Sequence, residues 1–375
     1  MALVLNEEQQ MLKTSAKEFL AENAPVEALR KLRDSGDPKG YDPALWKQMA
    51  ELGFAGITIP EDFGGMGFGY TGLGQVLEET GRTLTASPLV STVLLSATLI
   101  ELAGTNHQKA ALLPAIADGN LLVSVANEES NAHKPFQAAT RYIKSGDSVT
   151  ISGTKKFVLE GGVANKFIVS AKESDESGLT LFIVDAGTDG ISIDRTPMMD
   201  SRNIATVTFD NVQVGTKDIL GKEAEGVAPL ERALDIARIG LSAEMLGSMM
   251  EAYDRTIAYL KERHQFGVPI GVFQGLQHRA ADMYCEIENC KSLVIKSLQA
   301  IDADSKKLPV YASMTKAKIS QVLKRVTNEA IQMYGGIGMT DDEEIGFFMK
   351  RARVAQRTFG DSNYHLDRFA RLNGF

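Results

Sequence analysis

Hydrophobic residues in this 375-residue chain change their spacing twice, and these changes constrain the fold more than any other feature. Up to about residue 120 they recur every three to four positions, as on one face of a helix. From about 121 to 225 the segments are short, β-branched and often alternating, which favours an antiparallel β domain. From 226 onward the helical period returns, as in bundle helices. The sequence therefore predicts an α+β protein with a helical domain (1–120), a middle β domain (121–225) and a C-terminal α-helical bundle (226–375).

The charge and composition limit the possible partners. A net charge of −8 and a pI near 5.3 argue against nucleic acid or an anionic membrane as the main partner. The most apolar region, residues 88–104, is interrupted by Ser, Thr and Glu101, so a buried helix fits it better than a membrane span. The apolar run before Glu7 is too short for a signal peptide, and the five histidines lack metal-ligand spacing. We expect a cytoplasmic protein without a metal site, a nucleic-acid partner or a membrane partner.

Four segments carry a family resemblance when they are taken together in order. They are LWKQMAELGFAGITIPEDFGGMGFG from Leu45, GTKKFV from Gly153, ERHQFGVPIGVFQGLQHRAADM from Glu262 and QMYGGIG from Gln332. With the α–β–α order, they resemble acyl-CoA dehydrogenases over essentially the whole chain. The resemblance implies a helical N-terminal domain, a β middle domain and a C-terminal four-helix bundle. It also implies a flavoprotein that uses FAD to desaturate an acyl thioester between its α and β carbons.

The tail departs from the family at the residue that removes a proton. In the family, Gln-x-x-Gly-Gly-x-Gly is followed after a helix by Tyr-Glu-Gly-Thr, whose Glu commonly acts as the base. Here Phe359 stands before Gly360, and a phenyl ring cannot accept a proton. The position that some other members use, just before Arg238, holds Ala237. Asp361 is the nearest substitute for the base.

In this family each chain contributes to two FAD sites, its own and that of a neighbouring subunit. The contacts that reach the neighbour's FAD, the donated set, match the family pattern here. Arg263 stands where an arginine pairs with the pyrophosphate, as a planar cation can with two phosphate oxygens. The structural alternative for Arg263 is a solvated or ion-paired charge at a helix end. The donated set implied by the resemblance consists of Arg263, Gln265, Phe266, Gln274, Gln332, Gly335 and Gly336.

The contacts to the chain's own FAD depart from the family pattern. Asn127 keeps an amide for a flavin edge, and Phe157 replaces a flavin-stacking Trp. His133 replaces the Ser that meets the pyrophosphate, and Leu159 replaces a Thr that bonds the flavin. Asp361 adds a negative charge, which disfavours phosphate. Because these changes concentrate in one set, they indicate a chain that completes a site on another subunit.

The sequence therefore predicts the FAD-binding, base-lacking subunit of a heteromeric, α2β2 acyl-CoA dehydrogenase. The implied partners are a second dehydrogenase subunit with the catalytic Glu, an acyl-CoA substrate and an electron-transfer flavoprotein as acceptor. Steroid side-chain degradation is the implied setting. Two alternatives remain: a homotetrameric flavoenzyme that uses Asp361 as an unusual base, and a catalytically dead binding or scaffold protein.

Overall fold

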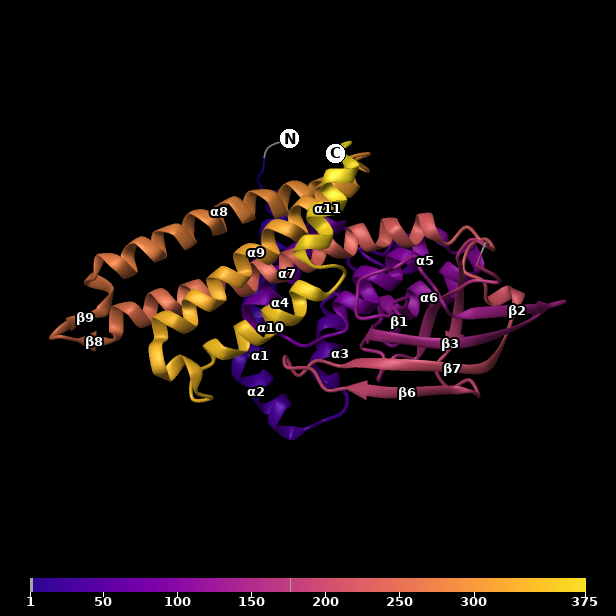
Figure 1. The fold of residues 1–375 in the computed structure, drawn as a ribbon, viewed down its shortest axis with the longest axis horizontal. Coiled ribbons are helices and arrows are strands. Elements are labelled where there is room, and N and C mark those ends of the chain that lie inside the picture. The colour runs from indigo at the N-terminus through magenta and orange to yellow at the C-terminus, as the bar shows by residue number, and fades with distance from the viewer. Residues whose placement is uncertain (1–2, 176) are drawn as a thin grey trace. The chain divides into compact units, whose positions relative to one another are not determined.

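The computed structural model describes residues 3–175 and 177–375, which form two compact units interleaved along the sequence (Figure 1). The helical unit contains the chain up to Lys31, Tyr70–Thr85 and Arg238–Phe375. The mixed unit, which holds the main sheets, contains Leu32–Gly69 and Ala86–Ala237. The predicted α+β class and the α–β–α order of elements are confirmed.

Two sheets form the β part of the mixed unit. The first has the order β1-β4-β5, with bounds Val123–Ala126, Lys166–Ala171 and Thr180–Asp185. The second has the order β2-β3-β7-β6, with bounds Arg141–Ser145, Ser148–Leu159, Ile204–Gly215 and Ile191–Thr196. In these two sheets the described pairs are antiparallel, as predicted, except that β1 pairs with β4 in parallel.

Aromatic contacts join strands in the core of the mixed unit. Phe167 on β4 meets Phe209 on β7 edge to face, with ring centroids 6.2 Å apart. Tyr142 on β2 meets Phe182 on β5 in the same geometry at 5.0 Å. Each of these pairs joins a strand of one sheet to a strand of the other, and all four side chains are buried. Burial of a phenylalanine side chain contributes roughly 1.5–3 kcal/mol, so these contacts hold the two sheets together.

Helices of the mixed unit begin where the sequence supplies caps. The Asp42 side chain accepts a hydrogen bond from the Ala44 backbone N–H at 2.8 Å, and Pro43 occupies the first turn of α3. Thr105 and Gln108 form a capping box at the start of α6. The bounds are α3 Pro43–Glu51, η1 Glu61–Phe63, η2 Leu89–Ala97, α5 Thr98–Ala103, α6 Asn106–Ala117 and η3 Thr216–Asp218.

The apolar region at 88–104 forms a buried helix, as predicted, but its first part, η2, is a π-helix. The hydroxyls of Thr92 and Ser96 both donate to the Val123 carbonyl oxygen, at 3.1 and 2.8 Å. These bonds join η2 to the start of β1 and satisfy hydroxyls that are almost wholly buried.

The helical unit packs long helices against one another. Helices α2 (Val26–Ser35) and α7 (Val227–Glu262) contain boundaries between the units. The other helices are α1 Glu7–Asn23, α4 Tyr70–Thr83, α8 Gln274–Asp302, α9 Leu308–Tyr334, α10 Ile345–Arg357 and α11 Ser362–Leu372. Short elements are β8 His264–Gln265, β9 Val268–Pro269, η4 Ile270–Val272 and η5 Gly335–Met339. No helix among the described residues is long and apolar enough to cross a membrane.

Two glycines let the backbones of α4 and α7 touch. A Cβ added at Gly247 would lie 1.7 Å from the Glu78 carbonyl oxygen, and one added at Gly81 would lie 1.9 Å from that of Glu244. Real Cβ contacts are never so short, so only glycine permits this approach. The helix from the N-terminal half is thereby fixed to the C-terminal helices.

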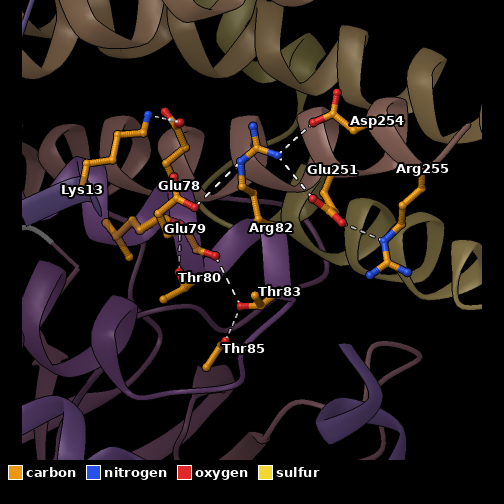
Figure 2. Close-up of polar contacts among 11 residues, drawn as sticks. Lys13, Glu78, Glu79, Thr80, Arg82, Thr83, Thr85, Glu251, Asp254 and Arg255 are labelled. Atoms are coloured by element: carbon orange, nitrogen blue, oxygen red, sulfur yellow. Dashed lines mark hydrogen bonds and ion pairs between the residues drawn. The ribbon is translucent and has the colours of Figure 1, made fainter. Parts of the chain in front are cut away.

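An ion-pair network lies beside this contact, and Figure 2 shows Arg82 of α4 at its centre. The Arg82 guanidinium bonds Asp254 at 3.1 Å and Glu251 at 3.3 Å, both on α7. Its Nε lies 3.8 Å from Glu79, which is almost wholly buried. Burial, and then the charge of the adjacent Glu78, raise the pKa of Glu79 above its ordinary value.

Candidate functional site

The two parts of the donated set lie at one end of the helical unit (Figure 1). Tyr259, in the last turn of α7, stacks on Tyr334, the last residue of α9, with ring centroids 4.2 Å apart. The Tyr259 hydroxyl also donates to the Tyr334 carbonyl oxygen at 3.2 Å. Because Arg263 follows α7 and Gly335 follows α9, this contact brings the two motifs together.

The hairpin of β8 and β9 presents the first motif to the outside. Phe266 adopts a left-handed backbone conformation with φ of +55°, and its side chain is 89% exposed. Its ring meets Phe273 edge to face at 6.0 Å. Arg263, Gln265 and Gln274 are exposed, and their side chains form no hydrogen bond or ion pair within the described part of the chain. Among the described residues, Arg263 forms no ion pair that would explain its charge at this helix end. Its guanidinium is therefore available to another molecule.

The glycines of the second motif are open to the outside. Gly335 ends α9 with φ of +68°, which favours glycine. Gly336 has no positive φ, and a Cβ there would meet no atom within 4 Å. The same open space surrounds Gly275 and Gly346, in the first turns of α8 and α10, and Gln332 is exposed in the last turn of α9. A ligand or second subunit close to the backbone would explain why Gly275, Gly336 and Gly346 are glycines.

The turn at Phe359 is fixed through its backbone. Phe359 has φ of +60°, and its carbonyl oxygen accepts a hydrogen bond from Arg238 Nε at 3.2 Å. Nε2 of the buried His365 lies 3.0 Å from the same oxygen. Ala237, at the other position where the sequence predicts a base in this family, is completely buried in α7. Neither of the two positions at which the resemblance predicts a base, 359 and 237, carries a side chain that accepts a proton.

A buried lysine fixes the same turn from α9. The Lys316 ammonium is fully buried and donates to three carbonyl oxygens, those of Ala355, Gln356 and Gly360, at 3.0, 3.1 and 3.1 Å. Burial, and then the charge of Arg238, lower the pKa of Lys316 to about 7. The sequence reasoning did not identify this lysine.

Asp361 has a structural role in the tail. Its carboxylate accepts the Tyr364 backbone N–H at 3.0 Å and thereby caps the start of α11. The Arg357 guanidinium lies 3.5 Å away. Helix capping alone accounts for an aspartate at this position.

In the mixed unit, the candidates Asn127 and Phe157 are placed differently. Asn127 follows β1 and is 7% exposed, and its amide Nδ2 is buried without a hydrogen-bond partner among the described residues. Phe157 lies at an irregularity of the β3–β7 pairing, with φ of +53° and a side chain 41% exposed. An unsatisfied buried amide and an exposed ring fit contact with a ligand.

In the loop after Asn127, the hydrogen-bond donors bond to two carboxylates of the same loop, those of Glu128 and Glu129. His133 Nδ1 lies 2.5 Å from the Glu128 carboxylate, and the Lys134 backbone N–H donates to the same carboxylate at 3.2 Å. The adjacent Glu129 accepts further donors of the loop. A pyrophosphate needs such donors, so this loop, whose donors are already bonded to Glu128 and Glu129, fits a phosphate group poorly. The Arg263 guanidinium, in contrast, has no partner among the described residues.

Comparison with known proteins agrees with this architecture. Three family profiles match in order: "Acyl-CoA dehydrogenase, N-terminal domain" at 6–120, "middle domain" at 127–212 and "C-terminal domain" at 224–372. The mitochondrial short/branched chain specific acyl-CoA dehydrogenase of Bos taurus is 30% identical over 97% of this chain and 85% of its own length.

Two solved structures show the same fold at similar identity. A chain of the Tcur3481–Tcur3483 steroid ACAD, in a variant form, has a TM-score of 0.89 and 32% identity, with 98% of each chain covered. A chain in a structure described as the electron transferring flavoprotein of Acidaminococcus fermentans has a TM-score of 0.92 and 30% identity, with 100% of each chain covered.

The fold and the family profiles define the class of protein as an oxidoreductase flavoprotein. The chain belongs to the acyl-CoA dehydrogenase family, whose members are FAD flavoproteins.

Proposed function

We propose that this chain is the base-lacking subunit of a heteromeric acyl-CoA dehydrogenase and completes the FAD site of a second, base-bearing subunit. The observation that carries the proposal is Phe359 at the base position, in a turn fixed by Arg238 and His365. Bound FAD accepts the β-hydride in this chemistry. The α-proton must go to a base, and the phenyl ring cannot act as one.

The donated set supports the second half of the proposal. Arg263, Gln265 and Gln274 are exposed without partners in the described chain, and Gly336 leaves the backbone open. In this proposal Arg263 pairs with the pyrophosphate of the partner's FAD, and Phe266, Gln332, Gly335 and Gly336 line its surroundings. The exposed aromatic ring of Phe266 gives the apolar contact that a subunit interface uses.

The similar structures support a choice of partners. The steroid ACAD is named for two proteins, Tcur3481 and Tcur3483, which favours a pair of different dehydrogenase subunits here. The word steroid in that name favours a bulky, steroid-derived acyl-CoA as the substrate. The likeness to a chain from the electron transferring flavoprotein structure favours that class of protein as the acceptor. A cytoplasmic location completes the proposal.

One observation favours a second candidate, a homomeric flavoenzyme that binds its own FAD. The buried, unpartnered amide of Asn127 suits a polar ligand in the chain's own site. That candidate requires Asp361 as its base, although Asp361 caps α11.

The test is the FAD content and native mass of the chain, alone and co-expressed with a dehydrogenase chain that carries Glu at the base position. We expect little flavin in the chain alone and one FAD per pair in a heteromer that oxidises acyl-CoA. One FAD per chain in an active homomer would instead establish the second candidate.

A further inference from the structure

Glu129, in the loop between β1 and β2, is the centre of a cluster of donors. One carboxylate oxygen accepts the Ala139 backbone N–H at 2.5 Å. The other accepts the Thr140 backbone N–H at 3.0 Å, the Thr140 hydroxyl at 2.7 Å and the Lys155 ammonium at 2.6 Å. Donors from the loop and from β3 thus converge on a single carboxylate.

Lys155, which supplies the positive charge, is completely buried. Its remaining described hydrogen bond goes to the Ser170 hydroxyl at 3.0 Å. A buried ammonium that loses its anion is strongly unfavourable, so Glu129 is what makes Lys155 compatible with the fold. Burial acts to raise the pKa of Glu129, but the charge of Lys155 and the hydrogen bonds to the carboxylate lower it below its ordinary value.

The same donors would suit any small anion. Consecutive backbone N–H groups, a hydroxyl and an ammonium are the groups that proteins use for phosphate and carboxylate. The site is also closely built, because a Cβ added at Gly153 on β3 would lie 2.4 Å from the Thr140 hydroxyl. The donors therefore keep their positions through packing as well as through Glu129.

We propose that Glu129 is an internal anion, which fills a built anion-binding site in the way that a free carboxylate or phosphate would, and that its removal opens the site to such an anion. The inference goes beyond the proposed function and stands on the geometry of these donors. It agrees with that function, because a chain that completes its partner's FAD site needs no phosphate of its own at this loop.

The experiment measures Tm for the full chain and for Glu129→Ala, with sodium acetate or sodium pyrophosphate and with sodium chloride at matched ionic strength. We expect Glu129→Ala to lower Tm by roughly 5–10 °C. Acetate or pyrophosphate should restore several degrees to this variant only, while chloride should not. Acetate tests replacement of the carboxylate itself, and pyrophosphate tests whether the site accepts a phosphate group.

A double variant and a matched control complete the test. Glu129→Ala with Lys155→Met removes the buried charge, so Tm should rise above that of Glu129→Ala and no longer respond to either anion. Glu223→Ala removes another carboxylate of the mixed unit, paired with Lys144 at 2.7 Å, and should show no anion rescue. If Glu129→Ala does not fold, Glu129→Gln with and without Lys155→Met tests the same charge relation.

The proposal is wrong if Glu129→Ala leaves Tm unchanged, if neither anion restores it, or if the double variant responds equally. In the Gln version, it is wrong if Lys155→Met fails to raise Tm. The FAD content of the co-expressed pair decides the proposed function separately. Anion rescue with one FAD per chain would keep Glu129 as an internal anion while rejecting the divided FAD site.

Discussion

The turn at Phe359 is fixed by side chains that bind its carbonyl groups and do not depend on the side chain at 359. Arg238 and His365 contact the Phe359 carbonyl oxygen, and Lys316 contacts that of Gly360. These contacts involve the backbone carbonyl oxygens and not the side chain at position 359. The proposed loss of the base is therefore compatible with the structure of the tail.

Asp361 can be tested as a cap and as a base by two substitutions. Asp361→Ala removes the cap of α11 and should lower the free energy of unfolding by about 1 kcal/mol, whereas Asp361→Asn keeps a capping side chain. We expect Asp361→Asn to retain both stability and the acyl-CoA oxidation rate of the assembled pair. Removal of a general base would slow that reaction by roughly 10²–10⁴-fold, so such a loss in stable Asp361→Asn would identify it as the base.

Lys316 should make stability depend on pH in a defined window. Its pKa falls from 10.5 to about 7 on folding. Between these pH values the unfolded chain binds the proton and the folded chain does not, so this group's contribution to the free energy of unfolding rises with pH. Urea unfolding of the wild type and Lys316→Met from pH 7 to 10 should show the wild type gaining stability relative to the variant.

Lys324→Met is the matched control, because Lys324 is exposed on the same helix. It should shift the stability curve without changing its dependence on pH. Parallel curves of stability against pH for the wild type and Lys316→Met would show that folding does not lower the pKa of Lys316.

Sequence patterns could predict the site only where its partners are close in sequence. Phe359 and Arg263 were found because motifs surround them. Lys316 reads as an ordinary helical lysine, since its carbonyl partners belong to α10 and the following turn. The pairing of Glu129 with Lys155 likewise depends on how β3 packs against the loop, and the spacing of residues in the sequence does not predict this packing.

At the scale of elements, the contact of α4 with α7 makes Gly247 irreplaceable. Gly247→Ala would place a Cβ 1.7 Å from the Glu78 carbonyl oxygen, so the helices must separate. We expect a loss of at least about 1–3 kcal/mol in the free energy of unfolding, measured in urea. Gly346→Ala, in open space at the start of α10, should instead gain up to about 1 kcal/mol. Equal effects of the two substitutions would show that the helices do not touch at Gly247.

Local signals predicted the elements better than their packing. Asp42 and Pro43 mark the start of α3, and the alternating segments mark the strands. The π-helical form of η2 and the parallel pairing of β1 with β4 depend on contacts such as Thr92 with Val123. The limits 1–120, 121–225 and 226–375 remain a prediction for the domains.

At the scale of the whole molecule, a net charge of −8 disfavours a polyanionic cofactor, so binding must come from locally placed groups. The glycine contact also explains why α4 belongs to the same compact unit as the C-terminal helices, although the sequence places it in the N-terminal half. That unit presents Arg263 and Gly336 at one end, where their loss should affect a partner rather than this chain.

We therefore expect Arg263→Gln and Gly336→Val to leave the Tm of this chain unchanged and to weaken FAD binding by the co-expressed pair. Loss of a hydrogen bond to a charged group is worth about 1.5–3 kcal/mol, so Arg263→Gln should weaken binding by roughly 10–100-fold. Flavin retained through dilution and gel filtration measures the effect, and Lys261→Gln, an exposed cation in the last turn of α7, is the control. If Arg263→Gln and Lys261→Gln retain FAD equally, the arginine does not reach the cofactor and the pair does not share its site in the proposed way.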